Sequence, residues 1–165
     1  MTQHQKYQII RKLEGLEVRQ YLPCVIADVE IEGDRDSAPN RGFTSLFQYI
    51  SSNKIAMTSP VLQEELPNHN WRVSFVMPAG LTVEELPLPA NSLVTLRNSE
   101  LHTAAAIKFS GKTTQATLPG HEATLRELLD LNGLVATGPV RVARFDPPWK
   151  PPFARHNEMI IPVNS

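Results

Sequence analysis

At 165 residues, the chain is long enough to bury a hydrophobic core without disulfides or metals, and we expect a single domain over residues 1–165. Sixteen basic and seventeen acidic side chains leave a formal charge of −1, which argues against nucleic acid as a partner because it gives no long-range attraction to polyphosphate. Cys24 is the only cysteine, which excludes an internal disulfide framework and a thiolate metal cluster.

The polar N-terminal residues and the lack of any long apolar run predict neither a signal peptide nor a membrane span. We therefore expect a cytoplasmic protein. The 41% hydrophobic and 20% charged residues are typical of a globular domain.

The first half of the sequence combines several strand-like segments with one helix. Strands are predicted over residues 7–13, 16–21, 24–31, 55–61 and 72–77. The clearest is 24–31, where apolar side chains alternate with Asp28 and Glu30. Apolar residues at positions 43, 46, 47 and 50 predict a helix that ends near Asn53.

The second half repeats this order after an irregular connection at 79–92. Further strands are predicted over residues 93–97, 103–109, 140–145 and 158–163. Leu125, Leu128 and Leu129 indicate a second helix, which opens at Pro119-Gly120 and closes at Asn132-Gly133. A proline-rich turn over 147–152 separates the last two strands.

Each half thus runs strand, helix, strand, proline-containing bend, strand, at an offset of roughly eighty residues. The repeat predicts an α+β fold in which antiparallel strands, covered by two helices, form a distorted barrel or paired sheets.

The sequence contains no assembled catalytic or metal-binding motif. The five histidines are not spaced to hold a metal from one element, and Cys24 is interpreted as a structural thiol. Glu158 starts an apolar strand beside Arg155 and His156, where an ion pair is favoured over general acid catalysis. We therefore expect no catalytic residue and no metal ligand.

Large apolar side chains gather near the proline-containing bends, where loops meet the ends of the strands. They can line a pocket for a flat hydrophobic ligand or simply cap the strand ends. These residues are Met57, Pro60, Val61, Phe145, Trp149, Pro152 and Phe153.

Three segments resemble the SOUL family of haem-binding proteins. Phe43 to Ile50 followed by Asn53-Lys54-Ile55-Ala56-Met57-Thr58-Ser59-Pro60-Val61 is similar to the family's helix and its Met-Thr-x-Pro-Val stretch. Phe75-Val76-Met77-Pro78 resembles the next strand. Pro147-Pro148-Trp149-Lys150-Pro151, continuing through Arg155-His156-Asn157-Glu158, is similar to the Pro-Pro-x-x-Pro and Arg-Arg-Asn-Glu ending. The resemblance runs in order over nearly the whole chain.

The resemblance implies two βαβ-type repeats that form an eight-stranded antiparallel β-barrel flanked by two α-helices. It also implies non-catalytic binding of haem or a related tetrapyrrole in a surface groove beside the first helix, as a carrier or buffer. Protein partners are not indicated.

The resemblance also assigns site residues. Lys54 and Lys150 match basic positions that can pair with propionates, and the apolar floor is assigned to Phe43, Phe47, Ile50 and Met57. Trp149, Phe153 and His156 complete the cofactor-binding set in the C-terminal segment. No histidine precedes the first helix at 37–42, so a strong axial ligand is not expected. His156 stands where the family usually has arginine, and it is interpreted as a hydrogen-bonding residue at the rim.

Two alternatives remain open. The fold resembles GyrI-like domains, which bind hydrophobic cations or hydrolyse small molecules through a buried glutamate, for which Glu158 is the candidate. An exposed rim of Trp149 and Phe153 is also compatible with a protein-interaction module.

Overall fold

The computed structural model describes residues 2–147 and 149–164. They divide into two compact units, each with one helix on one face of an antiparallel sheet. The first unit contains the residues before Lys6 together with Pro23–Glu100, and the second contains Lys6–Leu22 and the residues from Leu101 onward. No helix among the described residues is long and apolar enough to cross a membrane.

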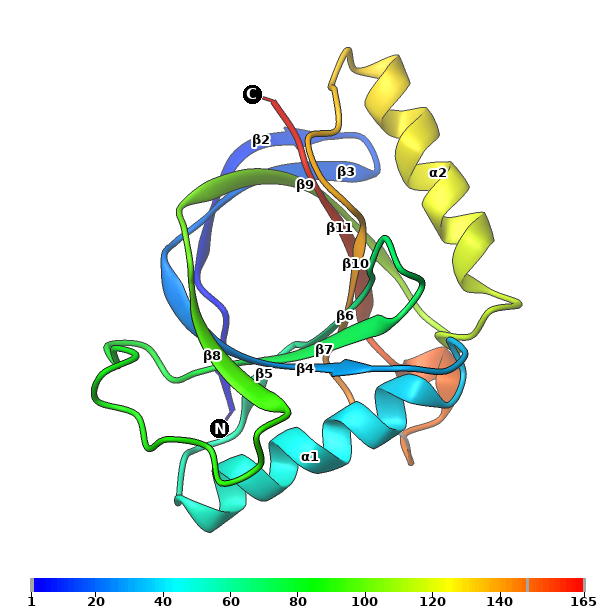
Figure 1. Ribbon diagram of the computed structural model, residues 1–165. Coiled ribbons are helices and arrows are strands. Elements are labelled where there is room, and N and C mark those ends of the chain that lie inside the picture. The colour runs from blue at the N-terminus through cyan, green and yellow to red at the C-terminus, as the bar shows by residue number, and fades with distance from the viewer. Residues whose placement is uncertain (1, 148, 165) are drawn as a thin grey trace. The chain divides into compact units, whose positions relative to one another are not determined.

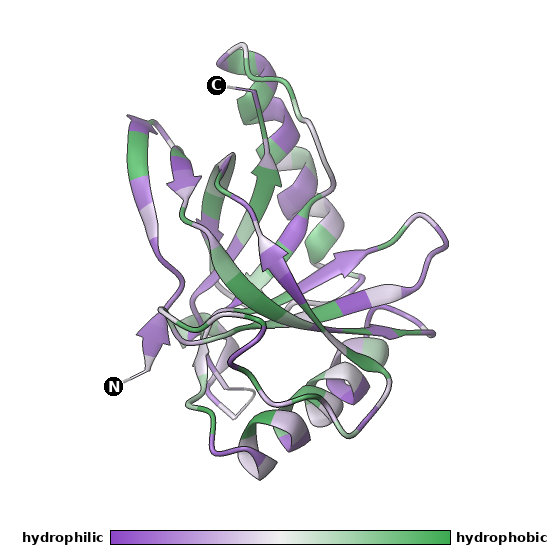
Figure 2. Cartoon of the chain, turned by 60° about the vertical axis from the view of Figure 1, so that its left-hand side comes forward, coloured by the Kyte–Doolittle hydropathy of each residue, from purple (hydrophilic) through white to green (hydrophobic). Residues whose placement is uncertain are grey.

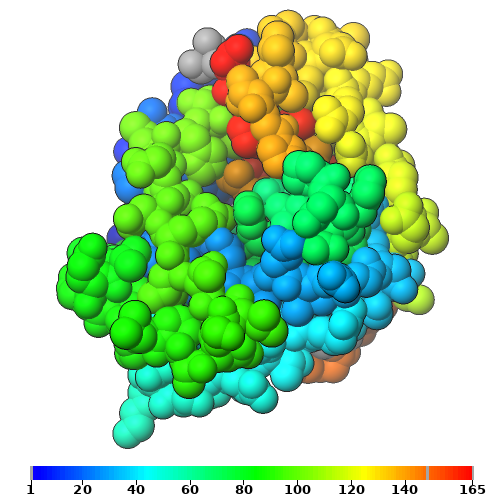
Figure 3. Space-filling view, viewed as in Figure 1, coloured from blue at the N-terminus to red at the C-terminus, as the bar shows by residue number. Residues whose placement is uncertain are grey.

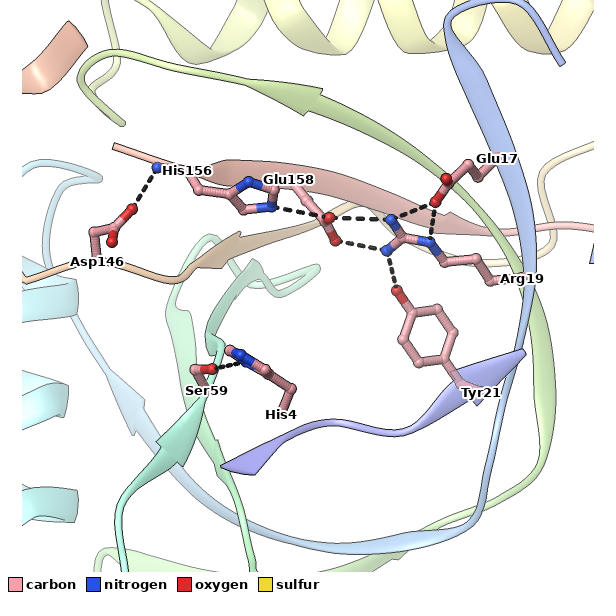
Figure 4. Close-up of polar contacts among 8 residues, drawn as sticks. All are labelled: His4, Glu17, Arg19, Tyr21, Ser59, Asp146, His156 and Glu158. Atoms are coloured by element: carbon pink, nitrogen blue, oxygen red, sulfur yellow. Dashed lines mark hydrogen bonds and ion pairs between the residues drawn. The ribbon is translucent and has the colours of Figure 1, made fainter. Parts of the chain in front are cut away.

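The first unit is built on a four-stranded sheet in the order β6-β7-β4-β8. Its elements are β1 (Gln3–His4), β4 (Cys24–Ile31), α1 (Ala38–Ser52), β5 (Thr58–Ser59), β6 (Val61–Glu65), β7 (Trp71–Val76) and β8 (Val94–Ser99). The two-residue strands β1 and β5 pair in parallel, with His4 hydrogen-bonded to Ser59 (Figure 4). The connection from β7 to β8 forms an irregular surface segment, coloured green at the lower left of Figure 3.

Helix α1 covers the face of this sheet on which the alternating apolar residues of β4 lie (Figure 1). Leu46 and Ile50 of α1 pack on Val29 and Val73 in one buried cluster. The helix begins at Ala38, earlier than its apolar stripe predicts, because Pro39 in the first turn has a backbone angle suited to a helix start. Gly42 allows close packing, since an added Cβ would lie 2.6 Å from a methyl carbon of Val73.

The second unit is a five-stranded sheet in the order β2-β3-β9-β11-β10. Its elements are β2 (Tyr7–Leu13), β3 (Leu16–Tyr21), β9 (His102–Phe109), α2 (Leu118–Leu131), β10 (Arg141–Arg144), the 3₁₀ helix η1 (Pro152–Ala154) and β11 (Asn157–Pro162). Its helix α2, yellow in Figure 1, packs Leu125 and Leu129 against Val18 of β3 and Met159 of β11. Both helices show bands of hydrophobic and hydrophilic residues in Figure 2, as an amphipathic helix on a sheet requires.

The predicted class, α+β with antiparallel strands and two helices, is confirmed. The described residues form nine strands in these sheets, four in the first unit and five in the second, where eight were expected.

Candidate functional site

The first unit carries five of the residues predicted to bind a cofactor, and they differ in exposure. Phe43 and Phe47 stack on each other in α1, with ring centroids 5.9 Å apart, and Phe47 is 48% exposed. Lys54 is exposed just after the helix, and Met57 is partly buried against the core. Ile50 lies inside the core with 3% of its surface exposed, so it offers little area to a ligand.

The second unit carries the other four predicted residues, on and after the proline-rich turn. Trp149 is 84% exposed and Phe153 is 83% exposed, although both are large apolar side chains. Backbone hydrogen bonds hold this turn: the amide of Gly111 donates to Pro152 at 2.9 Å, and that of Lys150 donates to Pro147 at 3.1 Å. The aromatic pair therefore projects from an ordered segment.

Asp146 organises the polar groups beside this turn. Its carboxylate accepts a hydrogen bond from the Lys150 ammonium at 3.0 Å and another from the backbone amide of His156. The hydrogen bond from the His156 amide and the nearby Lys150 hold the pKa of Asp146 below its usual range, despite the opposing effect of desolvation. Lys150 is thus half-exposed but already paired with an acid.

His156 faces away from the turn, toward Glu158. Its Nε2 lies 3.1 Å from a carboxylate oxygen of Glu158, and its ring meets the ring of Phe145 edge-on at 4.6 Å. An imidazole held in this way is occupied by a protein partner. No group of three or more metal-ligating side chains is present among the residues that the structure describes.

Glu158 belongs to a buried network that the sequence did not predict (Figure 4). Arg19 donates two hydrogen bonds to its carboxylate, at 2.6 and 3.0 Å. The same guanidinium donates to Glu17 at 2.7 and 2.9 Å and to the hydroxyl of Tyr21 at 2.8 Å. Arg19 is fully buried and Glu158 is 3% exposed.

Strand pairing explains how this network forms. Glu17, Arg19 and Tyr21 alternate along β3 with the core residues, so they share the face opposite α2. On β9, Ala106 pairs with Glu17 and Ala104 pairs with Arg19. These two small, buried residues leave room for the long guanidinium side chain.

The network keeps Glu158 ionised. Burial alone raises the pKa of this carboxyl, but the hydrogen bonds and positive charge of Arg19, with a smaller effect of His156, outweigh it and lower the pKa. A carboxylate in this state accepts hydrogen bonds and holds no proton to donate near neutral pH.

Glu158 forms the expected ion pair, with His156 as one partner, but its main partner is Arg19, which the sequence did not indicate, and no ion pair with Arg155 is seen among the described residues. The alternation of polar residues at 17, 19 and 21 was a signal that these side chains share one face. Their partner on β11 is 139 residues away in sequence, and no local pattern connects the two.

The sequence matches the family model described as SOUL heme-binding protein over residues 2–162, nearly the whole chain. No curated protein matches the chain in sequence.

Solved structures resemble the fold at low sequence identity. A structure described as a hydrolase from Listeria innocua has a TM-score of 0.68 and 16% identity, covering 94% of each chain. The EcmrR C-terminal domain has a TM-score of 0.66 and 14% identity, covering 96% of this chain and 98% of that one. EcmrR in a complex with DNA has a TM-score of 0.71 and 14% identity, covering 96% of this chain and 58% of that one. At such identities the likeness shows the fold alone.

Proposed function

The chain belongs to the SOUL haem-binding protein family, and on that premise we propose that it binds haem or a related tetrapyrrole without catalysis, as a carrier or buffer. The observation that carries the proposal is the exposure of Trp149 and Phe153, 84% and 83%, on a hydrogen-bonded turn. Large apolar side chains held in water at this exposure are typical of a surface that meets an apolar ligand.

The charges beside the aromatic pair suit the substituents of such a ligand. Lys150 lies next to Trp149 in sequence, and its ammonium is half-exposed, so it can approach a propionate while it keeps Asp146 as a partner. In the first unit, Phe47 and Lys54 present the same combination of an exposed ring and an exposed cation after α1. We propose each of these two surfaces as a candidate for the ligand, and each is tested separately.

The residues present fit the organic part of haem better than its iron. His156 is the nearest imidazole to the aromatic pair in sequence, and Glu158 already accepts its hydrogen bond. When bound, haem supplies a flat apolar face and two carboxylates. The chain would supply apolar contact and cations, for which an affinity in the micromolar to submicromolar range is expected, about −8 kcal/mol or somewhat tighter.

The contacts of Glu158 favour this proposal over the GyrI-like alternative. A cationic ligand or a proton transfer at Glu158 would have to displace Arg19, which is bound to both carboxylate oxygens. Such a displacement would leave a buried guanidinium with fewer acceptors, at a cost of several kcal/mol.

The test is a titration with haem followed by Soret absorbance. Phe153→Ala and Lys150→Ala are each expected to weaken one-to-one binding several-fold, because they remove apolar contact and a cation, respectively. Phe47→Ala and Lys54→Ala test the first-unit surface in the same way.

Matched controls are Leu88→Ala, which truncates an apolar side chain that is 91% exposed on the β7–β8 connection, and His69→Ala, on an exposed turn. Both should bind as the wild type does. Saturable binding that no site variant weakens would place the ligand elsewhere. Weak, non-saturating binding to the wild type would refute tetrapyrrole binding and leave the aromatic pair as a surface for a protein partner.

A further inference from the structure

Arg144, the last residue of β10, lies on the face of the second-unit sheet that α2 covers. It pairs with Asn157 of β11, which in turn pairs with Phe109 of β9, so the three side chains form one row on one face. The neighbouring row is Val142, Met159 and Ile107, which belong to the core beneath α2. Arg144 is thus on the opposite face from the Arg19–Glu158 network.

The guanidinium of Arg144 has no counter-ion among the residues that the structure describes. Its Nε is enclosed and has no hydrogen-bond partner, and no ion pair reaches this side chain from any residue in the described parts of the chain. Asn157 beside it donates its side-chain amide to the carbonyl of Gly111 at 3.0 Å. Leaving a charged donor enclosed without an acceptor is unfavourable, and proteins usually pair such groups.

The surroundings of Arg144 disfavour its charge. Desolvation lowers the pKa of Arg144, and the positive charge of Arg155 lowers it further. The acid that follows in sequence, Asp146, is committed to Lys150 and to the amide of His156. No carboxylate in the described parts of the chain forms an ion pair with Arg144.

Hydrogen bonds connect the surroundings of Arg144 to the turn that carries Trp149 and Phe153: Asn157, which pairs with Arg144, bonds Gly111, and the Gly111 amide donates to Pro152 at 2.9 Å. The Nε of Arg155 donates to the carbonyl oxygen of Lys150 at 2.8 Å, and Lys150 follows the exposed Trp149. A ligand that covers Trp149 and Phe153 would then have the Arg155 guanidinium close to its edge.

We propose that Arg144, assisted by Arg155, binds a carboxylate of the ligand, so that the tetrapyrrole site selects for free propionates. The inference rests on the proposed function. A planar carboxylate is the anion that a guanidinium binds through two parallel hydrogen bonds, which a lysine cannot reproduce.

The test compares protoporphyrin IX with its dimethyl ester, in which both carboxylates are blocked, by fluorescence titration of the full chain. Wild type is expected to bind the free acid about tenfold more tightly than the ester. Arg144→Met, which keeps the length of the side chain and removes the charge, is expected to bind the acid about tenfold more weakly and the ester as the wild type does. Arg144→Lys should lose about threefold for the acid, since it keeps the charge without the planar fork.

Arg126→Met is the matched control, because Arg126 is half-exposed on α2 and paired with Glu122. It should change neither affinity. Thermal unfolding separates a binding role from a structural one: Arg144→Met should melt at or above the wild-type temperature, because it removes a partly buried charge that no ion pair stabilises.

Four results would overturn the inference. Equal affinity of wild type for acid and ester, or wild-type affinity of Arg144→Met for the acid, would show that the carboxylate binds elsewhere while tetrapyrrole binding stands. A variant that fails to fold would assign Arg144 a structural role. If wild type binds neither porphyrin, the proposed function fails and the inference fails with it.

Discussion

Arg19 and Glu158 form a buried ion pair, and its contribution to stability depends on whether all the partners of Arg19 are present. Arg19 is fully buried, yet it has three partners, Glu17, Tyr21 and Glu158, and its guanidinium also lies over the ring of Tyr7 at 4.1 Å. The Coulombic gain of such a pair is offset by desolvation, so the intact network contributes modestly. Breaking it is costly, because the remaining charge stays buried.

We predict that Glu158→Gln lowers the free energy of unfolding by about 3 kcal/mol at neutral pH, because Arg19 keeps only Glu17 as an acidic partner. Urea denaturation measures the change. Glu122→Gln, which removes the acid of an exposed pair on α2, should cost less than about 0.5 kcal/mol. Equal effects of the two substitutions would show that burial does not set the strength of the pair.

The difference in unfolding free energy between wild type and Glu158→Gln should change with pH in one definite direction. The pKa of Glu158 is lowered in the folded protein, so its stabilisation is present above the unfolded value of about 4.3 and is lost as the pH falls through the folded value. The stability gap between wild type and Glu158→Gln should therefore shrink in acid below about pH 4. A constant gap would contradict the lowered pKa.

Sequence could place the members of this network on a face but could not pair them. The alternation over 16–21 separates Glu17, Arg19 and Tyr21 from the core residues. The partner of Arg19 is set by which strands lie beside β9, and that choice depends on long-range packing. The cofactor residues could be assigned one by one from the sequence. That the Nε of Arg144 is enclosed without a hydrogen-bond partner is visible only in the structure, because it depends on the same long-range packing.

Helix α1 shows how one small residue controls the packing of an element. Gly42 is buried in the helix, and an added Cβ would lie 2.6 and 2.9 Å from two carbons of Val73 and 3.2 Å from Val29. The glycine weakens the isolated helix by up to about 1 kcal/mol relative to alanine. The position requires glycine because α1 approaches β7 too closely for a methyl group.

We predict that Gly42→Ala lowers the free energy of unfolding by about 1–3 kcal/mol, because overpacking exceeds the gain in helix propensity. Gly120→Ala in α2 is the matched control, since an added Cβ there meets no atom within 4 Å. It should stabilise the protein by about 0.5–1 kcal/mol. Chemical denaturation measures both, and stabilisation by Gly42→Ala would show that α1 moves freely on its sheet.

At the scale of helices and strands, the sequence predicted most elements well. The strands at 7–13, 16–21 and 24–31 match β2, β3 and β4 at both ends, since period-two alternation or a turn dipeptide marks them. The start of α1 was less clear, because Ala38 and Asn40 carry little of the apolar stripe. Ala38 and Pro39 are nevertheless buried, and the proline suits the first turn of a helix.

For the whole molecule, the sequence repeat predicted two similar halves but not how the chain is divided between them. Residues 6–22 form the hairpin of β2 and β3, yet they belong to the second unit, because β3 pairs with β9. The chain therefore passes from the first unit to the second, back at Pro23, and across again at Leu101. Neither unit is one continuous segment.

We propose that the two units form a single cooperative domain, because removing either one would cut the other's chain connections. We predict one two-state unfolding transition for the full chain. Calorimetry tests it through the ratio of calorimetric to van't Hoff enthalpy, which should be close to one. Two resolved transitions would show that each unit unfolds independently.

The division of the chain also has a consequence during synthesis. The hairpin of β2 and β3 leaves the ribosome early, but its neighbour β9 begins only at His102, about eighty residues later. At ordinary translation speeds the nascent hairpin waits on the order of ten seconds for that neighbour. Throughout this interval the edge of β3 that β9 later occupies is unpaired. Leu16 and Val18 also lack the residues of β9, α2 and β11 against which they pack in the folded protein. The exposed Arg11 on β2, which pairs with Val18, places positive charge beside this apolar surface, a composition that opposes strand-to-strand association between nascent chains.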